Sequence, residues 1–229
     1  MRDIFNSLIK FNDNAKRNIV YVSKPADAFS SITDSDEERD IINLTSDLAR
    51  MQVARNNEMS DFYYSAAIGY PFQTKPYMKT RYSDGTYPVW YGSLSIETSI
   101  YETIYHTVNF LLAENNATAF IEKIIKKRSV FDVFCDAFLI DLTEKINDHP
   151  EIVSDNYEFT HKIGSLIHQG DLPGLVSPSR RHLGGKNLSI FKQSVLKNPV
   201  LLCNLRYEIF PATKTAKIFG LGEDLEISF

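Results

Sequence analysis

The residues best suited to chemistry lie between Arg81 and His106 in this chain of 229 residues. The stretch begins with a turn at 83–85, continues through an expected short aromatic strand at 87–91 and a serine-bounded loop, and ends in an amphipathic segment. Charge is scarce here, with Arg81 at one end and Glu102 near the other. A cation, aromatic rings and a carboxylate in one short stretch predict a ligand site.

The amphipathic segment, from about Ser95 to Ala113, has the spacing of a helix. With about 100° of rotation per residue, one face carries four apolar residues: Ile100, Ile104, Val108 and Leu111. Glu102, together with His106 and Asn109, falls on the opposite face. Glu102 therefore faces either solvent or a cleft, and spacing alone leaves both open.

A second concentration of chemistry is the segment GLVSPSRRHLGG at 174–185. An expected strand leads into Pro178 and Ser179, followed by two arginines, a histidine and a glycine pair. Small residues let a phosphate approach the backbone, and arginines make charge-assisted, often bidentate contacts to it. The alternative is an exposed basic turn between two strands, which composition alone favours.

Ordinary structural roles also exist for each residue of the first stretch. Arg81 can form a surface salt bridge, for example with Asp84, and Tyr87 and Trp90 can pack in a sheet. Glu102 can be a solvated helix residue. Taken singly these explanations are the stronger ones, but together they leave unexplained why polar residues cluster around aromatic strand ends and glycine turns.

Composition indicates a globular protein of ordinary polarity, with 43% hydrophobic and 24% charged residues. No uninterrupted apolar run is long enough for a membrane span, so we expect a cytoplasmic location without membrane contact. The formal net charge of −4 argues against direct nucleic-acid binding. Cys135 and Cys203 lie in apolar runs, as expected of buried reduced thiols. Histidine spacing indicates no metal site, and the phosphate-loop and dinucleotide-fold glycine patterns are absent.

The remaining pattern predicts an α+β fold. Ser35 and Glu38 form a capping box for a helix that continues to about Met51, whereas residues 56–80 are expected to be a loop or lid. A helix over 155–169 is expected to have Asp155 as its cap and Gly170 as its stop. Strands are expected over 18–23, 130–135, 138–142, 174–177, 188–191, 200–210 and 216–219. Because strands dominate the second half, a regular parallel α/β fold is disfavoured.

The two segments also resemble the signature of RES-domain proteins, a family named for an arginine, a glutamate and a serine. The first block comprises 81–85 and 90–93, followed by Glu97-Thr98, Glu102-Thr103 and His106. The second comprises 174–176, Pro178-Ser179, Arg181 and Gly184-Gly185. The resemblance spans about residues 18–219. Four residues depart from the usual family pattern: Thr80, Ser177 and the pair Lys186-Asn187, where an acid or cysteine is common.

The resemblance implies an ADP-ribosyltransferase-like α+β fold with mixed or antiparallel sheets flanked by helices. It also implies a single RES-like domain over 1–229, in which 1–55 form an N-terminal helical extension or an interface and 56–219 form the catalytic core. The implied activity is cleavage of the nicotinamide–ribose bond of NAD+ by hydrolysis or phosphorolysis, with NAD+ as substrate, inorganic phosphate as a potential co-substrate and no cofactor or metal.

The implied biological role is that of a bacterial toxin that depletes cellular NAD. Its expected partner is an antitoxin with a helix-turn-helix (Xre-like) fold, and we expect a homo-oligomer. Two alternatives remain open: an ADP-ribosyltransferase that modifies a protein target, and a non-catalytic module that binds the antitoxin.

Specific residues carry these expectations. The catalytic positions implied by the resemblance are Arg81, Tyr91, Glu102 and Ser179, and the NAD-binding positions are Arg81, Tyr82, Tyr91 and Arg181. Glu102 would stabilise the positive charge that develops on the ribose, and Ser179 would hold Glu102 or the ribose in place. Arg81 would bind the pyrophosphate, with Arg181 as a further phosphate contact, and Tyr91 would support the nicotinamide ring.

Overall fold

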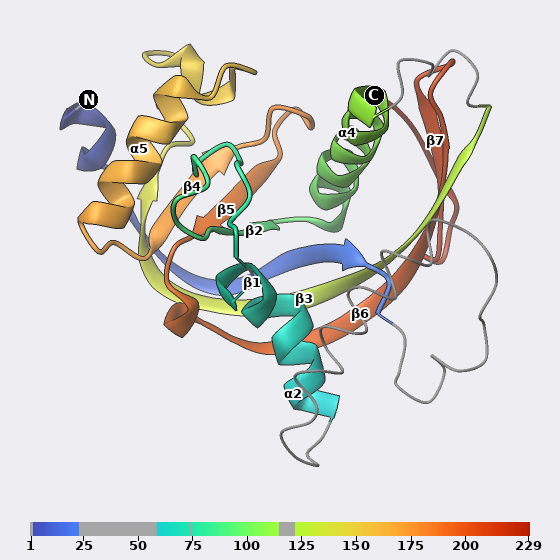
Figure 1. The fold of residues 1–229 in the computed structure, drawn as a ribbon, viewed down its shortest axis with the longest axis horizontal. Coiled ribbons are helices and arrows are strands. Elements are labelled where there is room, and N and C mark those ends of the chain that lie inside the picture. Colours follow the sequence, from blue (N-terminus) through green and yellow to red (C-terminus); the bar gives the residue numbers. More distant parts are fainter. Residues whose placement is uncertain (1, 23–58, 74, 115–121) are drawn as a thin grey trace.

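A computed structural model describes residues 2–22, 59–73, 75–114 and 122–229. Within these ranges the strands form one mixed eight-stranded sheet in the order β1-β2-β5-β4-β3-β6-β7-β8, with an additional pairing of β1 to β3 (Figure 1). The strands are β1 (Leu8–Val20), β2 (Trp90–Ser93), β3 (Ile124–Asp141), β4 (Gly174–Pro178), β5 (Lys186–Ile190), β6 (Leu196–Phe210), β7 (Thr215–Phe219) and β8 (Leu225–Ser228). The extra pairing closes a ring through β1, β2, β5, β4 and β3.

The two longest helices lie beside this ring, on either side of β2, β4 and β5 (Figure 1). They are α4 (Ile96–Glu114) and α5 (Glu158–Gln169). The other helical segments are η1 (Arg2–Asn6), α2 (Met59–Tyr64), the π-helix η2 (Ser65–Gly69), α3 (Tyr70–Gln73), η4 (Pro150–Val153) and η5 (Gln193–Val195). Among the helices in the described ranges, none has the length and apolar character needed to cross a bilayer.

Each long helix is fixed by its own apolar cluster. Ile100 and Ile104 of α4 are fully buried in a cluster that also contains Tyr207. Ile163 and Ile167 of α5 are fully buried in a second cluster. Each such side chain contributes about 1.5–3 kcal/mol on burial, so the two clusters fix α4 and α5 relative to the sheet.

Much of the sequence-based expectation is confirmed. The fold is α+β, and α4 matches the helix expected over 95–113, with Ser95 Oγ accepting a hydrogen bond from the Thr98 amide at 3.0 Å. The expected strands at 130–135 and 138–142 are parts of one long strand, β3. Strand β8 was not anticipated, and the aromatic strand expected over 87–91 begins only at Trp90.

The expectation of a loop or lid over 56–80 is wrong for residues 59–73, which are helical from α2 through α3. The middle of this segment is buried at Ala66, Ala67 and Ile68, and the indole Nε1 of Trp90 donates a hydrogen bond to the Ala67 carbonyl at 2.7 Å. A tertiary contact therefore stabilises a helix whose sequence has no clear polar face.

The first residues also differ from the helical extension expected for 1–55. Their described part consists of η1 and strand β1, which pairs along its whole length with β3, from Leu8 opposite Ile140 to Val20 opposite Arg128. The capping-box helix expected near 35–51 lies outside the described residues. Helix α5 begins at Glu158, so Asp155 is not its cap, whereas Gly170 does cap its C-terminus.

Candidate active site

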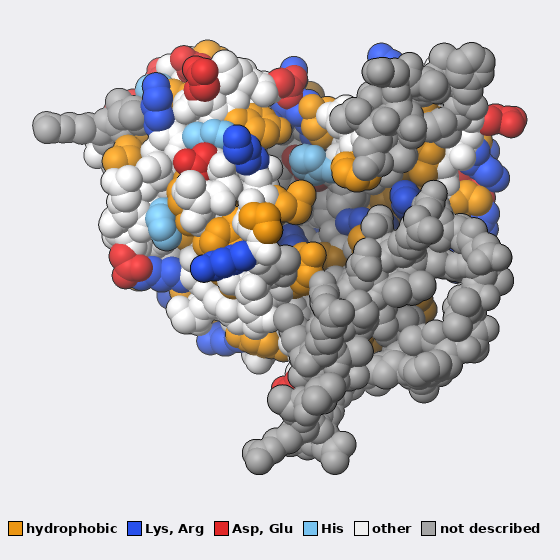
Figure 2. Space-filling view, in the orientation of Figure 1, with side chains coloured by type: hydrophobic (Ala, Val, Ile, Leu, Met, Phe, Trp, Pro, Cys, Tyr) orange, Lys and Arg blue, Asp and Glu red, His pale blue; other side chains and the backbone are white. Residues whose placement is uncertain are grey.

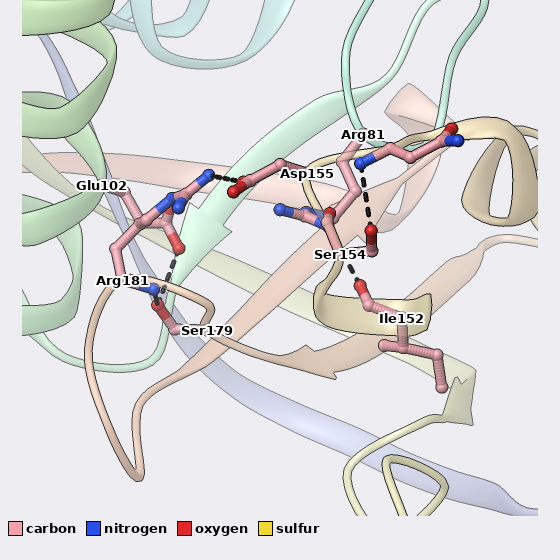
Figure 3. Close-up of polar contacts among 8 residues, drawn as sticks. Arg81, Glu102, Ile152, Ser154, Asp155, Ser179 and Arg181 are labelled. Atoms are coloured by element: carbon pink, nitrogen blue, oxygen red, sulfur yellow. Dashed lines mark hydrogen bonds and ion pairs between the residues drawn. The ribbon is translucent and has the colours of Figure 1, made fainter. Parts of the chain in front are cut away.

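The carboxylate of Glu102 is held from the turn that follows β4. Ser179 Oγ donates a hydrogen bond to Glu102 Oε1 at 2.7 Å (Figure 3). Helical phase explains the direction of Glu102, because Ile100 and Ile104 bury the opposite side of α4. Glu102 thus faces other protein groups, and the space between it and Arg81 in Figure 3 is called the recess below. The arrangement is the one expected if Ser179 positions Glu102.

The turn itself determines which way the Ser179 hydroxyl points. Its oxygen accepts hydrogen bonds from the backbone amides of Arg181 at 3.1 Å and His182 at 3.0 Å. The Ser179 amide donates in turn to the Gly185 carbonyl at 2.8 Å. Since a hydroxyl has a single proton and its lone pairs face two amides, that proton is directed to the Glu102 carboxylate.

His182 attaches this turn to α4. Its ring stacks on Tyr101 with centroids 4.8 Å apart and planes 3° from parallel, and its Nδ1 lies 2.9 Å from Thr98 Oγ1. Gly185 fits beneath it, because a Cβ there would lie 2.6 Å from Thr98 Oγ1. The glycine pair noted in the sequence therefore serves close packing of the turn against the helix.

Asn187 on β5 is a site residue that the sequence did not single out as functional. Its Nδ2 donates to Glu102 Oε1 at 2.7 Å, and its Oδ1 accepts a hydrogen bond from Ser93 Oγ at 2.7 Å. The only signal in the sequence was its departure from the usual family pattern. Both hydrogen bonds to Glu102 from the described residues fall on Oε1, so Oε2 accepts none from them.

Arg181 spans the recess from the same turn. Its guanidinium lies over the ring of Tyr105, with 3.2 Å from Cζ to the ring centroid. It also pairs with the carboxylate of Asp155 ahead of α5 (Figure 3). The hydrogen bond from Arg181 holds the pKa of Asp155 below its usual value. Arg181 is thus a cation near Glu102 that the Tyr105 ring holds in place, and a ligand can replace its other partner, Asp155.

Arg81 lies on the opposite side of the recess. Its Nη1 donates to the carbonyls of Ile152 at 3.1 Å and Ser154 at 2.6 Å (Figure 3). Its guanidinium stacks 4.7 Å from the centroid of the Tyr157 ring. The surface pair with Asp84 does not form; that carboxylate instead accepts from Thr86. Arg81 therefore orders the segment before α5, while only Nη1 of its fork makes these hydrogen bonds.

The two tyrosines assigned to NAD binding are placed differently. Tyr91 directs its hydroxyl to the loop that carries Arg81, 2.7 Å from Thr80 Oγ1 and accepting from the Tyr82 amide at 3.0 Å. Burial raises the pKa of Tyr91, so this hydroxyl acts as a neutral group. The side chain of Tyr82 is only 1% exposed within the α5 cluster, and burial raises its pKa to about 12. Tyr82 therefore lies in the core rather than in the recess.

His106 lies one helical turn beyond Glu102, and its pKa depends on the charged groups around it. Desolvation lowers the pKa of His106, the Glu102 carboxylate raises it, and Arg181 and Arg81 lower it further. Glu102, Arg181 and Arg81 therefore all act electrostatically on His106. In the space-filling view the surface is hollowed between the α5 side and the α4 side, with basic, acidic and histidine side chains around the hollow (Figure 2).

The arrangement suits a ligand with both a phosphate and a centre that becomes positive. Guanidinium groups bind phosphate, and a carboxylate held on one oxygen can stabilise a nearby cation with the other. A family model described as RES domain matches residues 48–209, which is more than half of the chain. Among curated proteins, no sequence matches this chain significantly.

Proposed function

Because the chain belongs to the RES-domain family, we propose that it cleaves the nicotinamide–ribose bond of NAD+, with water or inorganic phosphate as acceptor. The observation that carries the proposal is the Glu102 carboxylate, whose Oε1 is held by Ser179 and Asn187. The proposal includes an ADP-ribosyltransferase-like fold, supported by the mixed sheet and the α+β architecture.

Departure of nicotinamide breaks the bond from the ribose carbon to the ring nitrogen, and the electron pair leaves with the now neutral nicotinamide. Positive, oxocarbenium-like charge then develops on the ribose. Glu102 would stabilise this charge through Oε2, more strongly than it stabilises bound NAD+. Water would give ADP-ribose and a proton, whereas phosphate would give ADP-ribose 1″-phosphate.

The two arginines support binding of the pyrophosphate. Arg181 is already positioned by the ring of Tyr105, and a pyrophosphate oxygen can replace the carboxylate of Asp155 as its partner. Arg81 can contribute nitrogens other than Nη1 from the opposite side of the recess. Tyr91 would then hold the Arg81 loop through its hydroxyl, and its ring would offer a face to the nicotinamide.

We further propose that this activity makes the protein a toxin that acts in the cytoplasm and depletes NAD. A helix-turn-helix antitoxin would neutralise it, and the toxin would be a homo-oligomer. Support for these biological roles comes from family membership.

The test is release of nicotinamide from NAD+ by the purified, antitoxin-free protein, measured with and without phosphate. Glu102→Gln serves as the inactive reference, and Glu144→Gln, which changes an exposed carboxylate on the loop after β3, serves as the control. Phosphate-dependent release would indicate phosphorolysis. Absence of release from the wild type would refute NAD cleavage, and labelled protein formed from labelled NAD+ in a lysate would favour ADP-ribosyl transfer instead.

A further inference from the structure

We propose that Asn187 is a positioning residue that holds Glu102 in the geometry needed for NAD cleavage, an inference that rests on the proposed function. Asn187 links Glu102 to the sheet, because its Nδ2 donates to Glu102 Oε1 and its Oδ1 accepts from Ser93 Oγ, both at 2.7 Å. Without it, Ser179 alone would hold the carboxylate.

The chemistry of the partners fixes which end of the amide faces Glu102. A carboxylate only accepts hydrogen bonds, so the NH2 group of Asn187 must face Glu102 Oε1. The amide oxygen then faces Ser93, whose hydroxyl donates to it. Since Ser93 is only 5% exposed, water competes little for this hydrogen bond. The orientation of the amide therefore follows from the hydrogen-bonding network.

The backbone at Asn187 is held from both sides. On β5 it is paired with Ser93 of β2 on one edge and with Ser177 of β4 on the other. The same two neighbouring strands lead to Tyr91 and to Ser179. Among the described residues, the backbone of α4 makes no hydrogen bond to β2, β4 or β5. The side chain of Asn187 therefore fixes the Glu102 carboxylate relative to these central strands.

The two donors leave one defined atom for the substrate. Ser179 and Asn187 both bind Oε1, so Oε2 accepts no hydrogen bond from the described residues and is the carboxylate oxygen left for a substrate. Both donors are neutral, which keeps the negative charge of Glu102 available for the ribose cation. A second carboxylate in place of the amide would compete for a proton with Glu102 at hydrogen-bonding distance.

The substitution Asn187→Asp tests this role, because it keeps an acceptor for Ser93 but replaces the donor to Glu102 with an acid. We expect the acidic limb of the kcat profile to move to higher pH by about one unit or more, since two adjacent carboxylates share a proton. Asn187→Ala should lower kcat by about tenfold or more with a smaller change in KM. Thermal unfolding of each variant checks that it folds.

Asn204→Asp is the matched control, because Asn204 is also a strand residue whose Oδ1 accepts from a serine, Ser129, but it binds no carboxylate among the described residues. Its pH profile should coincide with that of the wild type. If the wild type releases nicotinamide and the Asn187→Asp variant has the same pH profile as the wild type, the positioning role of Asn187 is refuted. The proposed function then still stands. If the wild type releases none, the proposed function fails, and this role fails with it.

Discussion

Ser179 Oγ lies 2.7 Å from Glu102 Oε1, although the two residues are 77 positions apart in the sequence. The contact joins the turn after β4 to the middle of α4. Each element depends on the other for the site. Without the contact, Glu102 would be an ordinary residue on the helix surface and Ser179 an ordinary residue of a turn. The pair therefore defines the site more sharply than either motif does.

The first prediction concerns this pair. Ser179→Ala should lower kcat for nicotinamide release by about 10-fold to 100-fold, because Glu102 keeps only the Asn187 hydrogen bond. Glu102→Gln should lose at least about 100-fold, since the charge itself is removed. The double variant should be no slower than Glu102→Gln alone, because the two residues act as one unit. Additive losses in steady-state kinetics would show that Ser179 acts independently of Glu102.

Breaking the ion pair across the recess should affect binding more than stability. In Asp155→Asn the guanidinium of Arg181 stays on Tyr105 but loses its charged partner, so the pyrophosphate meets less competition. We expect KM for NAD+ to fall by up to about fivefold and the free energy of unfolding to change by less than about 1 kcal/mol.

Asp171→Asn is the control for this variant, since its carboxylate is exposed and pairs with Lys192 beyond the other end of α5. It should leave KM unchanged. An increase in KM for Asp155→Asn would mean that Asp155 orients Arg181 for the substrate instead of competing with it.

Arg81→Lys separates the structural role of this residue from its binding role. Lysine lacks the planar guanidinium that stacks on Tyr157 while its Nη1 contacts two carbonyls, so the free energy of unfolding should fall by about 1–2 kcal/mol. KM for NAD+ should rise as well if Arg81 also binds pyrophosphate. Denaturant titration and kinetics of one preparation provide both values, and an unchanged KM would limit Arg81 to the structural role.

Local patterns in the sequence predicted one half of the site. Glu102 could be assigned to the outer face of α4 because the period of Ile100 and Ile104 is a property of one helix. Asn187, which binds Glu102 together with Ser179, was not predicted as functional. Asn187 and Glu102 are 85 positions apart in the sequence, and an asparagine on a strand has no distinctive pattern.

The same reasoning explains the other differences. The partners of Arg81 are backbone carbonyls, which any residue type provides, so the sequence holds no sign of them. The helical segment at 59–73 is buried around Ala67, so it lacks the alternation of apolar and polar faces by which a helix is recognised in a sequence. Tyr82 matched the family motif by type, but its position between α5 and the sheet depends on tertiary packing.

The lowered pKa of His106 should be visible in the pH dependence of the free energy of unfolding. Desolvation lowers its folded-state pKa below the ordinary value of 6.5, so the unfolded chain takes up the proton first as the pH falls. The wild type should therefore lose stability relative to His106→Asn between about pH 7 and pH 5, with no divergence above about pH 7.5. Unfolding titrations of both proteins across this range test the expectation. Parallel curves would show that His106 titrates as it does in the unfolded chain.

Gly164 provides the sharpest test of how α5 packs behind the site. An alanine usually stabilises the interior of a helix relative to glycine by about 1 kcal/mol, because it restricts the unfolded chain. Here a Cβ would lie 1.9 Å from the carbonyl oxygen of Tyr82, which is backbone, and 2.9 Å from the hydroxyl of Tyr87. Gly164→Ala should therefore destabilise the protein by about 2 kcal/mol or more, the opposite of the helix preference.

Displacing the Tyr82 backbone also moves its neighbour Arg81, so the same variant should raise KM for NAD+. Ser165→Ala, one residue further along α5, is the control: among the described residues it removes a single hydrogen bond, from Gln169, and its free energy of unfolding should stay within about 0.5 kcal/mol of the wild type. If Gly164→Ala were as stable as the wild type, α5 could not lie this close to the loop that carries Arg81. The position of that arginine relative to Glu102 would then have to differ as well.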